Sequence, residues 1–477
     1  MRAARIDVPR SDLPLMAVGL ALTALFVFAA SAVGGTLSLG LVTGIALFFG
    51  VIAAFMVAPH VAVACTIPLF AVLPALKVLA FPWLGPAKDL VTIAAICAAV
   101  ILVIQRSSQG QPQRADFWIV VCVAALGTFY ILNAGGLEWD LAWAHGVRLV
   151  LEPLLLLLVG MTLDQPRRVL HWSMVSLVAT AMFVAAVGIL QQPLGMGRLY
   201  GYGYLFDYHL RTFHGQLRSF GTLDEPFAYA AFLLLAVAAL VMWFRLGIVT
   251  LVAAATILAG LAFSFVRTAI IILLALLALW LARRSYAAMS IFLLGAATTL
   301  AFAVLIVSSN TTESRTVRTG SSTFLTINGR TESWRIFLGD PDVWVLGHGV
   351  GEVGTAADRA TYTISQDEDD IDEQGRAVDS GYFAVIADVG LLGLIALLAI
   401  LGRVVGLAAR YARMGSGAAW LALALSAVLL IDAVTRASFT GFPTAFLAML
   451  LIGVALGAAM DDASAAEARP RRSRAPR

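Results

Sequence analysis

Arginines beside long apolar stretches are the residues of this chain whose type and placement could do chemistry. Arg218 lies in a segment rich in aromatic residues, and Arg267 interrupts the otherwise apolar stretch 247–282. A charged side chain that faces lipid costs up to about 3 kcal/mol, so each arginine should face a cavity or an anion. A planar guanidinium forms bidentate bonds with phosphate oxygens, which makes an anionic substrate plausible. The alternative is that these side chains reach the polar headgroups of a membrane.

The segment 192–225 alternates aromatic residues with Arg198, Arg211 and Arg218. Most of these aromatic side chains fit a belt at a membrane interface. Next to the arginines, some could also stack on sugar rings beside bound phosphates.

The longest polar segment, 308–378, contains Arg330, Trp334, Arg335 and Trp344. A polar island between membrane helices is where a water-exposed substrate would be handled, although a solvated connector is the alternative. Two large aromatic residues need a burial partner, so we expect the segment to fold over the membrane face towards Arg218 and Arg267.

Other patterns exclude several kinds of site. His209 and His214 lack the spacing of a helical metal pair, and the acidic run 366–376 lacks the pattern of an EF-hand loop. The glycine-rich stretch 347–354 is not in a nucleotide-binding context, and the three cysteines lie in apolar stretches. We therefore expect no metal, no cofactor and no disulfide.

The elements that must position these residues are membrane helices. The 477 residues are 60% hydrophobic and only 13% charged, against about 25% charged in a soluble domain. We predict an all-α polytopic membrane protein with about fourteen spans, counted at about 20 residues each. They are 13–33, 37–58, 60–80, 90–105, 117–134, 147–163, 169–191, 227–244, 247–264, 268–282, 287–307, 382–405, 418–430 and 442–460.

The distribution of arginine predicts the orientation. With the N-terminus in the cytoplasm, most loop arginines and the basic tail 461–477 fall on the cytoplasmic side, as the positive-inside rule requires. The organisation is then helices 1–307 with an outer loop at 192–225, an outer loop at 308–378, helices at 379–460 and the tail. At about 36 residues, the stretch 247–282 is far too long for one span, so it should fold as two helices that meet near Arg267 on the outer side.

Four segments in order resemble the O-antigen ligase and O-antigen polymerase family. LRSFGTLDEPFAYAAFLLL (217–235) and SFVRTAIIILLALLALWL (264–281) are similar to two helix starts of that family, each with an arginine. GRTESWRIFLGDPDVWVLGHGVGEVG (329–354) and DSGYFAVIADVGLLG (379–393) resemble its loop element and the helix that follows. The resemblance covers residues 217–393, whereas the earlier spans match only in type.

The resemblance implies metal-independent transfer of a glycan from a polyprenyl-diphosphate carrier to an acceptor hydroxyl, at the outer face of the cytoplasmic membrane. Arg218 and Arg267 occupy the positions of two arginines that hold the carrier's diphosphate. We expect a lipid bilayer, the glycan donor and the acceptor as partners, and no nucleic acid. The expected substrate-binding residues are Arg148, Arg211, Arg330, Trp334, Arg335 and Tyr382.

Asp379 is the expected acceptor-side catalytic residue, and there the chain departs from the family. Ligases have a histidine at this position, so Asp379 favours a polymerase or a related envelope-glycan transferase. A carboxylate can still act as a general base, or orient a hydroxyl, if it is close enough. Asp379 could equally be the N-cap of the next helix, and the two roles are compatible.

Two other functions remain open on the sequence. A transporter or flippase of lipid-linked glycan would show paired repeats and charges near the membrane midplane, and we find no repeat. A peptidoglycan-type polymerase has a similar helical plan but fits the four segments less well.

Overall fold

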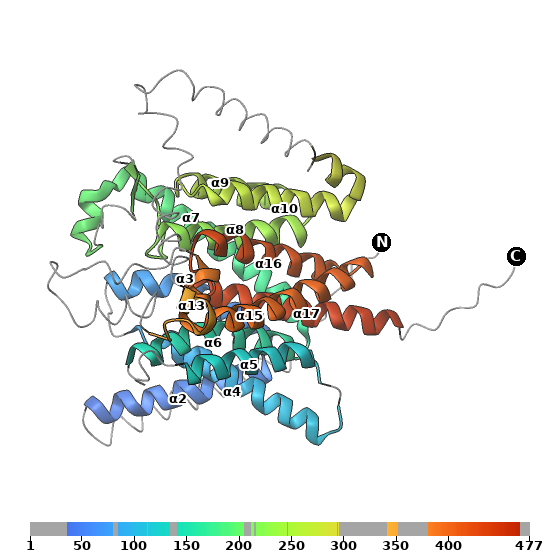
Figure 1. Ribbon diagram of the computed structural model, residues 1–477. Helices are drawn as coiled ribbons and strands as arrows, with labels where there is room; N and C mark the ends of the chain where they lie inside the picture. The colour runs from blue at the N-terminus through green and yellow to red at the C-terminus, as the bar shows by residue number, and fades with distance from the viewer. Residues whose placement is uncertain are drawn as a thin grey trace, which may run out of the picture.

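The protein is a bundle of helices that run along one common axis, with two very short strands at one end (Figure 1). The computed structural model describes residues 36–79, 84–111, 113–133, 141–204, 211–213, 216–245, 247–292, 294, 341–351 and 380–467. The first half contains α2 (Thr36–Val57), α3 (Pro59–Leu79), α4 (Ala87–Ser108), α5 (Phe117–Leu132), α6 (Leu141–Thr162) and α7 (Pro166–Gly201). The second half contains α8 (Pro226–Met242), α9 (Ile248–Ala262), α10 (Thr268–Arg284), α13 (Pro341–Leu346), α15 (Gly381–Arg413), α16 (Gly417–Thr435) and α17 (Thr444–Glu467).

Within the described residues, seven helices are long and apolar enough to cross a membrane. The class predicted from composition, an all-α membrane protein, agrees with this. Fourteen spans are not shown, because α5, α8 and α9 have only 15 to 17 residues, and about 20 are needed to cross the hydrocarbon core. The predicted span 13–33 and most of 287–307 lie outside the described residues.

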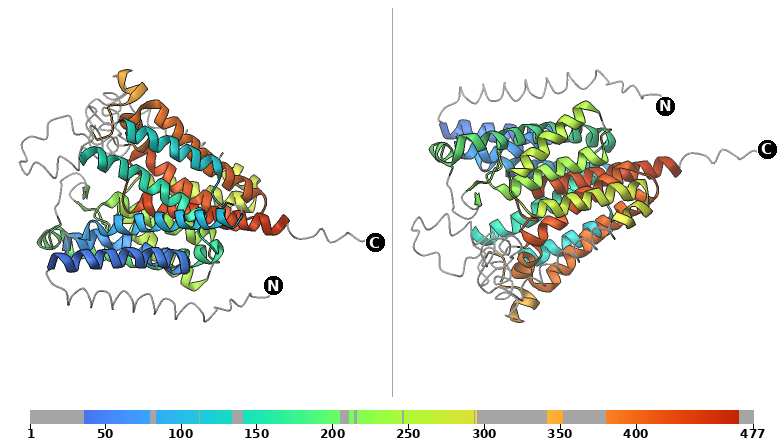
Figure 2. Two further views of the ribbon diagram at one scale, coloured as in Figure 1. Left: turned by 90° about the horizontal axis from the view of Figure 1, so that it is seen from below. Right: turned by 90° about the horizontal axis from the view of Figure 1, so that it is seen from above.

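Helix α17 lies at the centre of the bundle and packs against α6, α7, α15 and α16 (Figure 2). Its contact with α6 is a close backbone approach, because a Cβ atom on Gly453 would overlap the carbonyl oxygen of Leu157, and one on Gly160 that of Leu450. Small residues at such crossings let membrane helices pack through their backbones. The central helix therefore serves as the support on which the other helices are placed.

Several boundaries differ from the sequence prediction. Helix α7 continues to Gly201 across a kink at Gly195, whose φ of 70° ends one helical segment and starts the next. Residues 192–201 are therefore helical, although the predicted outer loop included them. Helix α17 runs to Glu467, so the predicted tail 461–477 begins as helix, and residues 468–477 lie outside the described residues.

The end of the bundle that carries residues 202–204, 211–213 and 216–225, the turn 263–267 and the segment 436–443 is called the loop end below; it is the left-hand end in Figure 1. At the opposite end, arginines of α4, α7 and α15 form ion pairs with aspartates. Their nitrogen and oxygen atoms lie 2.5 Å apart in Arg106–Asp164 and 2.8 Å apart in Arg403–Asp116, and Arg167 pairs with Asp462.

Candidate functional site

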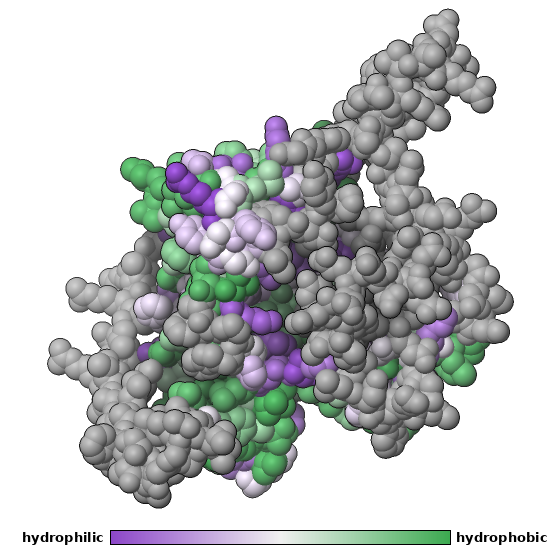
Figure 3. All heavy atoms as spheres, turned by 90° about the vertical axis from the view of Figure 1, so that its left-hand side faces the viewer, coloured by the Kyte–Doolittle hydropathy of each residue, from purple (hydrophilic) through white to green (hydrophobic). Residues whose placement is uncertain are grey.

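Figure 3 views the loop end directly and shows hydrophilic residues gathered near its middle, between apolar regions. Hydrogen bonds and ion pairs connect the charged residues of this end in two groups: the segment before α8 with the turn between α9 and α10 and with the connection between α16 and α17, and the start of α4 with α6. These segments are far apart in the sequence. The site is therefore a product of helix packing.

Arg218 lies against the turn that leads to Arg267. Its Nε donates to the backbone oxygen of Ser264 across 3.1 Å, and the next amide, that of Ser219, donates to the oxygen of Phe263 across 2.9 Å. The guanidinium lies 4.5 Å from the centre of the Phe227 ring, and the residue is 7% exposed. The predicted break of 247–282 into two helices is confirmed, and Arg267 lies directly before α10. The structure thus joins the two backbone segments that carry the predicted arginine pair.

Two glutamines near the end of α7 hold the segment that follows Arg218. The side-chain oxygen of Gln191 accepts hydrogen bonds from the amides of Phe220 and Gly221, and its nitrogen donates to the oxygen of Gly221. Gln192 donates to the hydroxyl oxygen of Ser219 across 2.7 Å. Sequence reasoning missed both residues. The amide pair in QQP at the end of an apolar span was the available signal, because a buried amide needs hydrogen-bond partners.

Arg211, a predicted substrate-binding residue, is held by the protein itself. Its Nη2 lies 2.5 Å from Oδ1 of Asp224, and its guanidinium is 5.0 Å from the Phe220 ring centre and 5.7 Å from that of Tyr204. Burial raises the pKa of the Asp224 carboxyl, and the charge of Arg211 opposes that rise. Tyr204 and Phe220 are themselves buried against each other, whereas Tyr200 and Tyr202 remain exposed. Of these four rings, only the exposed pair is placed to stack on a sugar.

Arg148, also predicted, belongs to a cluster of four charged residues between α4 and α6. Its Nη1 lies 2.9 Å from Oδ2 of Asp89. The Nζ of Lys88 lies 3.0 Å from Oδ1 of Asp89 and 4.0 Å from Oε2 of Glu152. Two cations and two anions share a largely buried space, and the sequence had singled out only Arg148.

Arg436 is a further residue that the sequence analysis missed. Its Nη2 lies 2.9 Å from Oε2 of Glu225, the residue before α8, and its Nη1 lies 3.9 Å from Oδ2 of Asp432. Its backbone oxygen accepts from the amide of Gly381, the first residue of α15. Arg436 therefore links the segment after Arg218 to the helix that follows Asp379. It lies at the loop end like Arg218, and an arginine between two apolar spans was the signal that could have found it.

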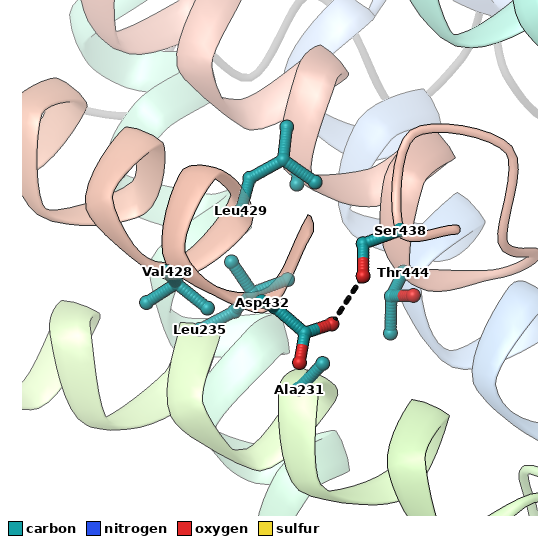
Figure 4. A pocket seen from close by; sticks show the side chains of 8 residues that line it. Ala231, Leu235, Val428, Leu429, Asp432, Ser438 and Thr444 are labelled. Carbon is teal, nitrogen blue, oxygen red and sulfur yellow. Dashed lines mark hydrogen bonds between the residues drawn. The ribbon is translucent and has the colours of Figure 1, made fainter. Parts of the chain in front are cut away.

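Asp432 supports this connection from inside the bundle. Figure 4 shows its carboxylate and Ser438 at a small cavity that Thr444 also lines, between α8, α16 and α17. The Ser438 hydroxyl donates to Asp432 Oδ2 across 2.5 Å. Ser438 follows Arg436 by two residues, so this bond restrains the segment between α16 and α17 that carries Arg436.

The start of α15 is fixed against α16. Ser380 occupies the N-cap position, and its hydroxyl donates to the oxygen of Ala433 across 3.3 Å. Asp379 is therefore not the N-cap residue. The hydroxyl of Tyr382, a predicted substrate-binding residue, donates to the oxygen of Leu430 across 3.0 Å. Asp379, Arg330, Trp334 and Arg335 lie outside the described residues.

The described part of the long polar segment, 341–351, docks on a kink in α15. Gly390 interrupts the helix with a φ of 72°, and Gly347 has a φ of 75°. A Cβ on Gly347 would lie 2.6 Å from the oxygen of Ala387, and one on Gly390 would overlap the carbonyl of Val345. Asn133 donates to the oxygens of both Leu346 and Asp388. The glycine-rich stretch is thus a helix-packing element here, and Trp344 lies in α13, half-buried.

No group of three or more metal-binding side chains occurs in the part of the chain that the structure describes. The arrangement offers guanidinium groups and carboxylates instead, which bind phosphates and sugar hydroxyls. No protein-family model matches the chain, and no curated protein matches it.

Proposed function

We propose that this protein is a metal-independent glycosyltransferase of the cytoplasmic membrane. It transfers a glycan from a polyprenyl-diphosphate carrier to an acceptor hydroxyl at the outer face, in the assembly of a cell-envelope or secreted polysaccharide. The observation that carries the proposal is the docking of Arg218 on the turn that precedes Arg267. It joins two arginine-bearing segments 49 positions apart at the loop end, which suits an anionic substrate.

The chemistry assigns a role to each side of the site. The acceptor oxygen attacks the anomeric carbon of the glycan, the bond from that carbon to the diphosphate breaks, and the carrier diphosphate leaves with the bonding electrons. Arg218 and Arg267 stabilise the charge that develops on the diphosphate, with each charge-assisted hydrogen bond contributing about 1.5–3 kcal/mol. Asp379 orients the acceptor hydroxyl and takes its proton. Its neighbour Ser380 donates a hydrogen bond to Ala433 of α16. The segment that follows α16 contains Arg436, which forms an ion pair with Glu225.

The proposed orientation places the loop end outside. Several of the basic residues that predict a cytoplasmic face pair with aspartates at the opposite end: Arg106, Arg114, Arg167 and Arg403. Among the described residues, ten arginines lie at or near that end (Arg106, Arg114, Arg167, Arg168, Arg245, Arg283, Arg284, Arg403, Arg410 and Arg413), against six at the loop end (Arg148, Arg198, Arg211, Arg218, Arg267 and Arg436). An excess of arginine on one side is typical of the cytoplasmic side of a membrane protein.

Incubation of the purified protein with carrier-linked glycan from its native cells, in detergent and with a chelator present, tests the proposal. We expect release of polyprenyl diphosphate together with a glycosylated acceptor. The variant Asp379→Asn should slow transfer while binding of the carrier persists, because its effect lies in the transition state. Intact donor in detergent, combined with movement of the donor across vesicles that contain the protein, would assign a flippase instead. Transfer at the wild-type rate by Asp379→Ala would remove that residue from the mechanism.

A further inference from the structure

The four charged residues between α4 and α6 form the most concentrated polar group inside the described bundle. Lys88 and Asp89 lie in the first turn of α4, and Arg148 and Glu152 are one turn apart on α6. Lys88 is 9% exposed and Glu152 is 5% exposed. A buried charge is tolerated only with partners, since transfer out of water costs several kcal/mol.

The pairs within this cluster leave hydrogen-bonding capacity unused. Arg148 Nε and Glu152 Oε2 are buried and have no hydrogen-bond partner among the described residues, whereas Lys88 Nζ and Asp89 Oδ1 lie 3.0 Å apart and pair with each other. The nearest cation to the Glu152 carboxylate, Lys88, is 4.0 Å away, which is too far for a hydrogen bond. Buried polar atoms of this kind are normally satisfied, by protein, water or ligand. The unsatisfied atoms are thus a donor, Arg148 Nε, and an acceptor, Glu152 Oε2.

The balance of charge decides which ligand fits. Two cations and two carboxylates sum to zero, so a phosphate would be repelled by Asp89 and Glu152 as strongly as it is attracted by the cations. A hydroxyl group both donates and accepts, so it can satisfy a carboxylate and an ammonium or guanidinium in turn. The rings of Phe442 and Phe446 lie beside the cluster, with centres 5.3 Å and 5.1 Å from Lys88 Nζ. Carboxylates, cations and an aromatic wall together suit a polyhydroxylated ring.

The cluster is physically connected to the Arg218 segment. Phe442 packs on Phe70 of α3, with ring centres 5.2 Å apart. The next residue of α3, Ala71, accepts a hydrogen bond from the hydroxyl of Thr222, four residues after Arg218. The aromatic wall of the cluster and the Arg218 segment therefore contact neighbouring residues of α3, so the two places lie on the same part of the loop end.

We propose that Lys88, Asp89, Arg148 and Glu152 bind a sugar ring of the donor glycan, at a site separate from the one that holds the diphosphate. This inference rests on the proposed function and assigns the two parts of the donor to two places. The cluster selects the glycan, and the arginine pair holds the carrier.

Binding of two probes separates these roles: undecaprenyl diphosphate that carries the native glycan, and undecaprenyl diphosphate without sugar. The test variant is K88M/E152Q, which removes one cation and one anion and so leaves no uncompensated charge. A second variant, D89N/R148Q, removes the other pair in the same way. The matched control is R106M/D164N, because Arg106 of α4 pairs with Asp164, in the connection that follows α6, at the opposite end of the bundle.

We expect wild-type protein to bind the glycan-linked carrier more tightly than the bare carrier. Both cluster variants should weaken binding of the glycan-linked carrier about tenfold or more and leave binding of the bare carrier unchanged, whereas the control should change neither. Equal loss for both probes would place the cluster in the diphosphate site and overturn the inference, and so would unchanged binding of both. Misfolding of both cluster variants beside a folded control would assign the four residues to stability alone.

The same experiment separates this inference from the function on which it rests. Wild-type protein that binds neither probe contradicts the proposed function. Wild-type protein that binds both probes with equal affinity keeps the carrier site and contradicts only the sugar site.

Discussion

Arg436 Nη2 lies 2.9 Å from Glu225 Oε2, and this ion pair joins the connection before α17 to the start of α8. The backbone oxygen of Arg436 also accepts from the first amide of α15. One residue therefore contacts both the segment that follows Arg218 and the helix that follows Asp379. In the proposed reaction these are the donor side and the acceptor side, so their relative position decides the geometry of attack.

Charge reversal tests this connection. R436E or E225R alone places like charges together, and we expect each to lower the rate of transfer about tenfold or more, since misplaced reacting groups lose rate steeply. The double variant E225R/R436E restores an opposite-charge pair and should recover much of that rate. The effect of E225R on stability should be smaller, about 1 kcal/mol or less, because the Glu225 side chain is 46% exposed; R436E should cost more, because it also places a carboxylate beside the buried Asp432. Transfer rates and thermal midpoints of the three variants form a double-mutant cycle, and a cycle with no coupling would contradict the linking role.

Replacement of Arg218 or Arg267 by lysine keeps the charge and removes the planar fork. We expect transfer to fall about 100-fold in each variant, as the loss of one or two charge-assisted hydrogen bonds implies. Arg283→Lys is the control, because Arg283 lies at the opposite end, where it donates to the oxygen of Met242. Near-normal transfer by both test variants would show that a point charge is enough and would contradict a bidentate clamp.

The sequence predicted the all-α membrane class because its apolar stretches are long and strongly bounded, whereas fourteen spans are not shown. It also predicted the turn before Arg267, since 247–282 is too long for one span and a charge needs a polar place. The cluster around Glu152 could not be predicted in this way. Lys88 and Asp89 look like ordinary charges at a helix start, and only the packing of α4 against α6 brings Arg148 and Glu152 to them.

Tertiary packing, which local sequence does not reveal, also decides which aromatic residues of the outer segment are buried and where α7 ends. Spacing alone could not separate Tyr204, which packs on Phe220, from the exposed Tyr202. The proline and glycines after Gln192 favoured a loop, whereas α7 accommodates them by kinking at Gly195. Local sequence marks a break in a helix but does not decide whether the chain resumes the helix afterwards.

Two aspartates outside the membrane helices should give opposite pH dependence of stability. Burial raises the pKa of Asp224 despite Arg211, so the folded state holds this proton more tightly than the unfolded state. The resulting stabilisation is complete below the unfolded pKa and is lost as the pH rises through the folded pKa. Burial would also raise the pKa of Asp116, but hydrogen bonds from Arg403 and from the amide of Ile119 lower it overall. Its stabilisation is therefore present above the unfolded pKa and is lost as the pH falls through the folded pKa.

Thermal midpoints measured across the acid range, for wild type and for the variants D224N and D116N, separate the two cases. As the pH rises, the midpoint of wild type relative to D224N should decrease, and that relative to D116N should increase. The subtraction removes all other titrating groups, so slopes of the same sign would contradict one of the two assignments.

Gly390 is the position where a single methyl group should separate the long polar segment from the bundle. Its φ of 72° and ψ of −171° lie in a region that is essentially restricted to glycine, where a residue with a Cβ costs about 1–3 kcal/mol. The added Cβ of Gly390→Ala would also overlap the carbonyl of Val345 in α13. We expect a clear fall in thermal midpoint and faster proteolysis near residues 341–351, because α13 can no longer dock. In the sequence, the proposed acceptor-side residue Asp379 lies between that segment and α15, so transfer should fall as well, while binding of the bare carrier persists.

Gly402→Ala on the same helix is the control: its Cβ meets no atom within 4 Å, and alanine favours the helix by up to about 1 kcal/mol. If the two alanine variants behave alike, the close contact between Gly390 and α13 does not support the site.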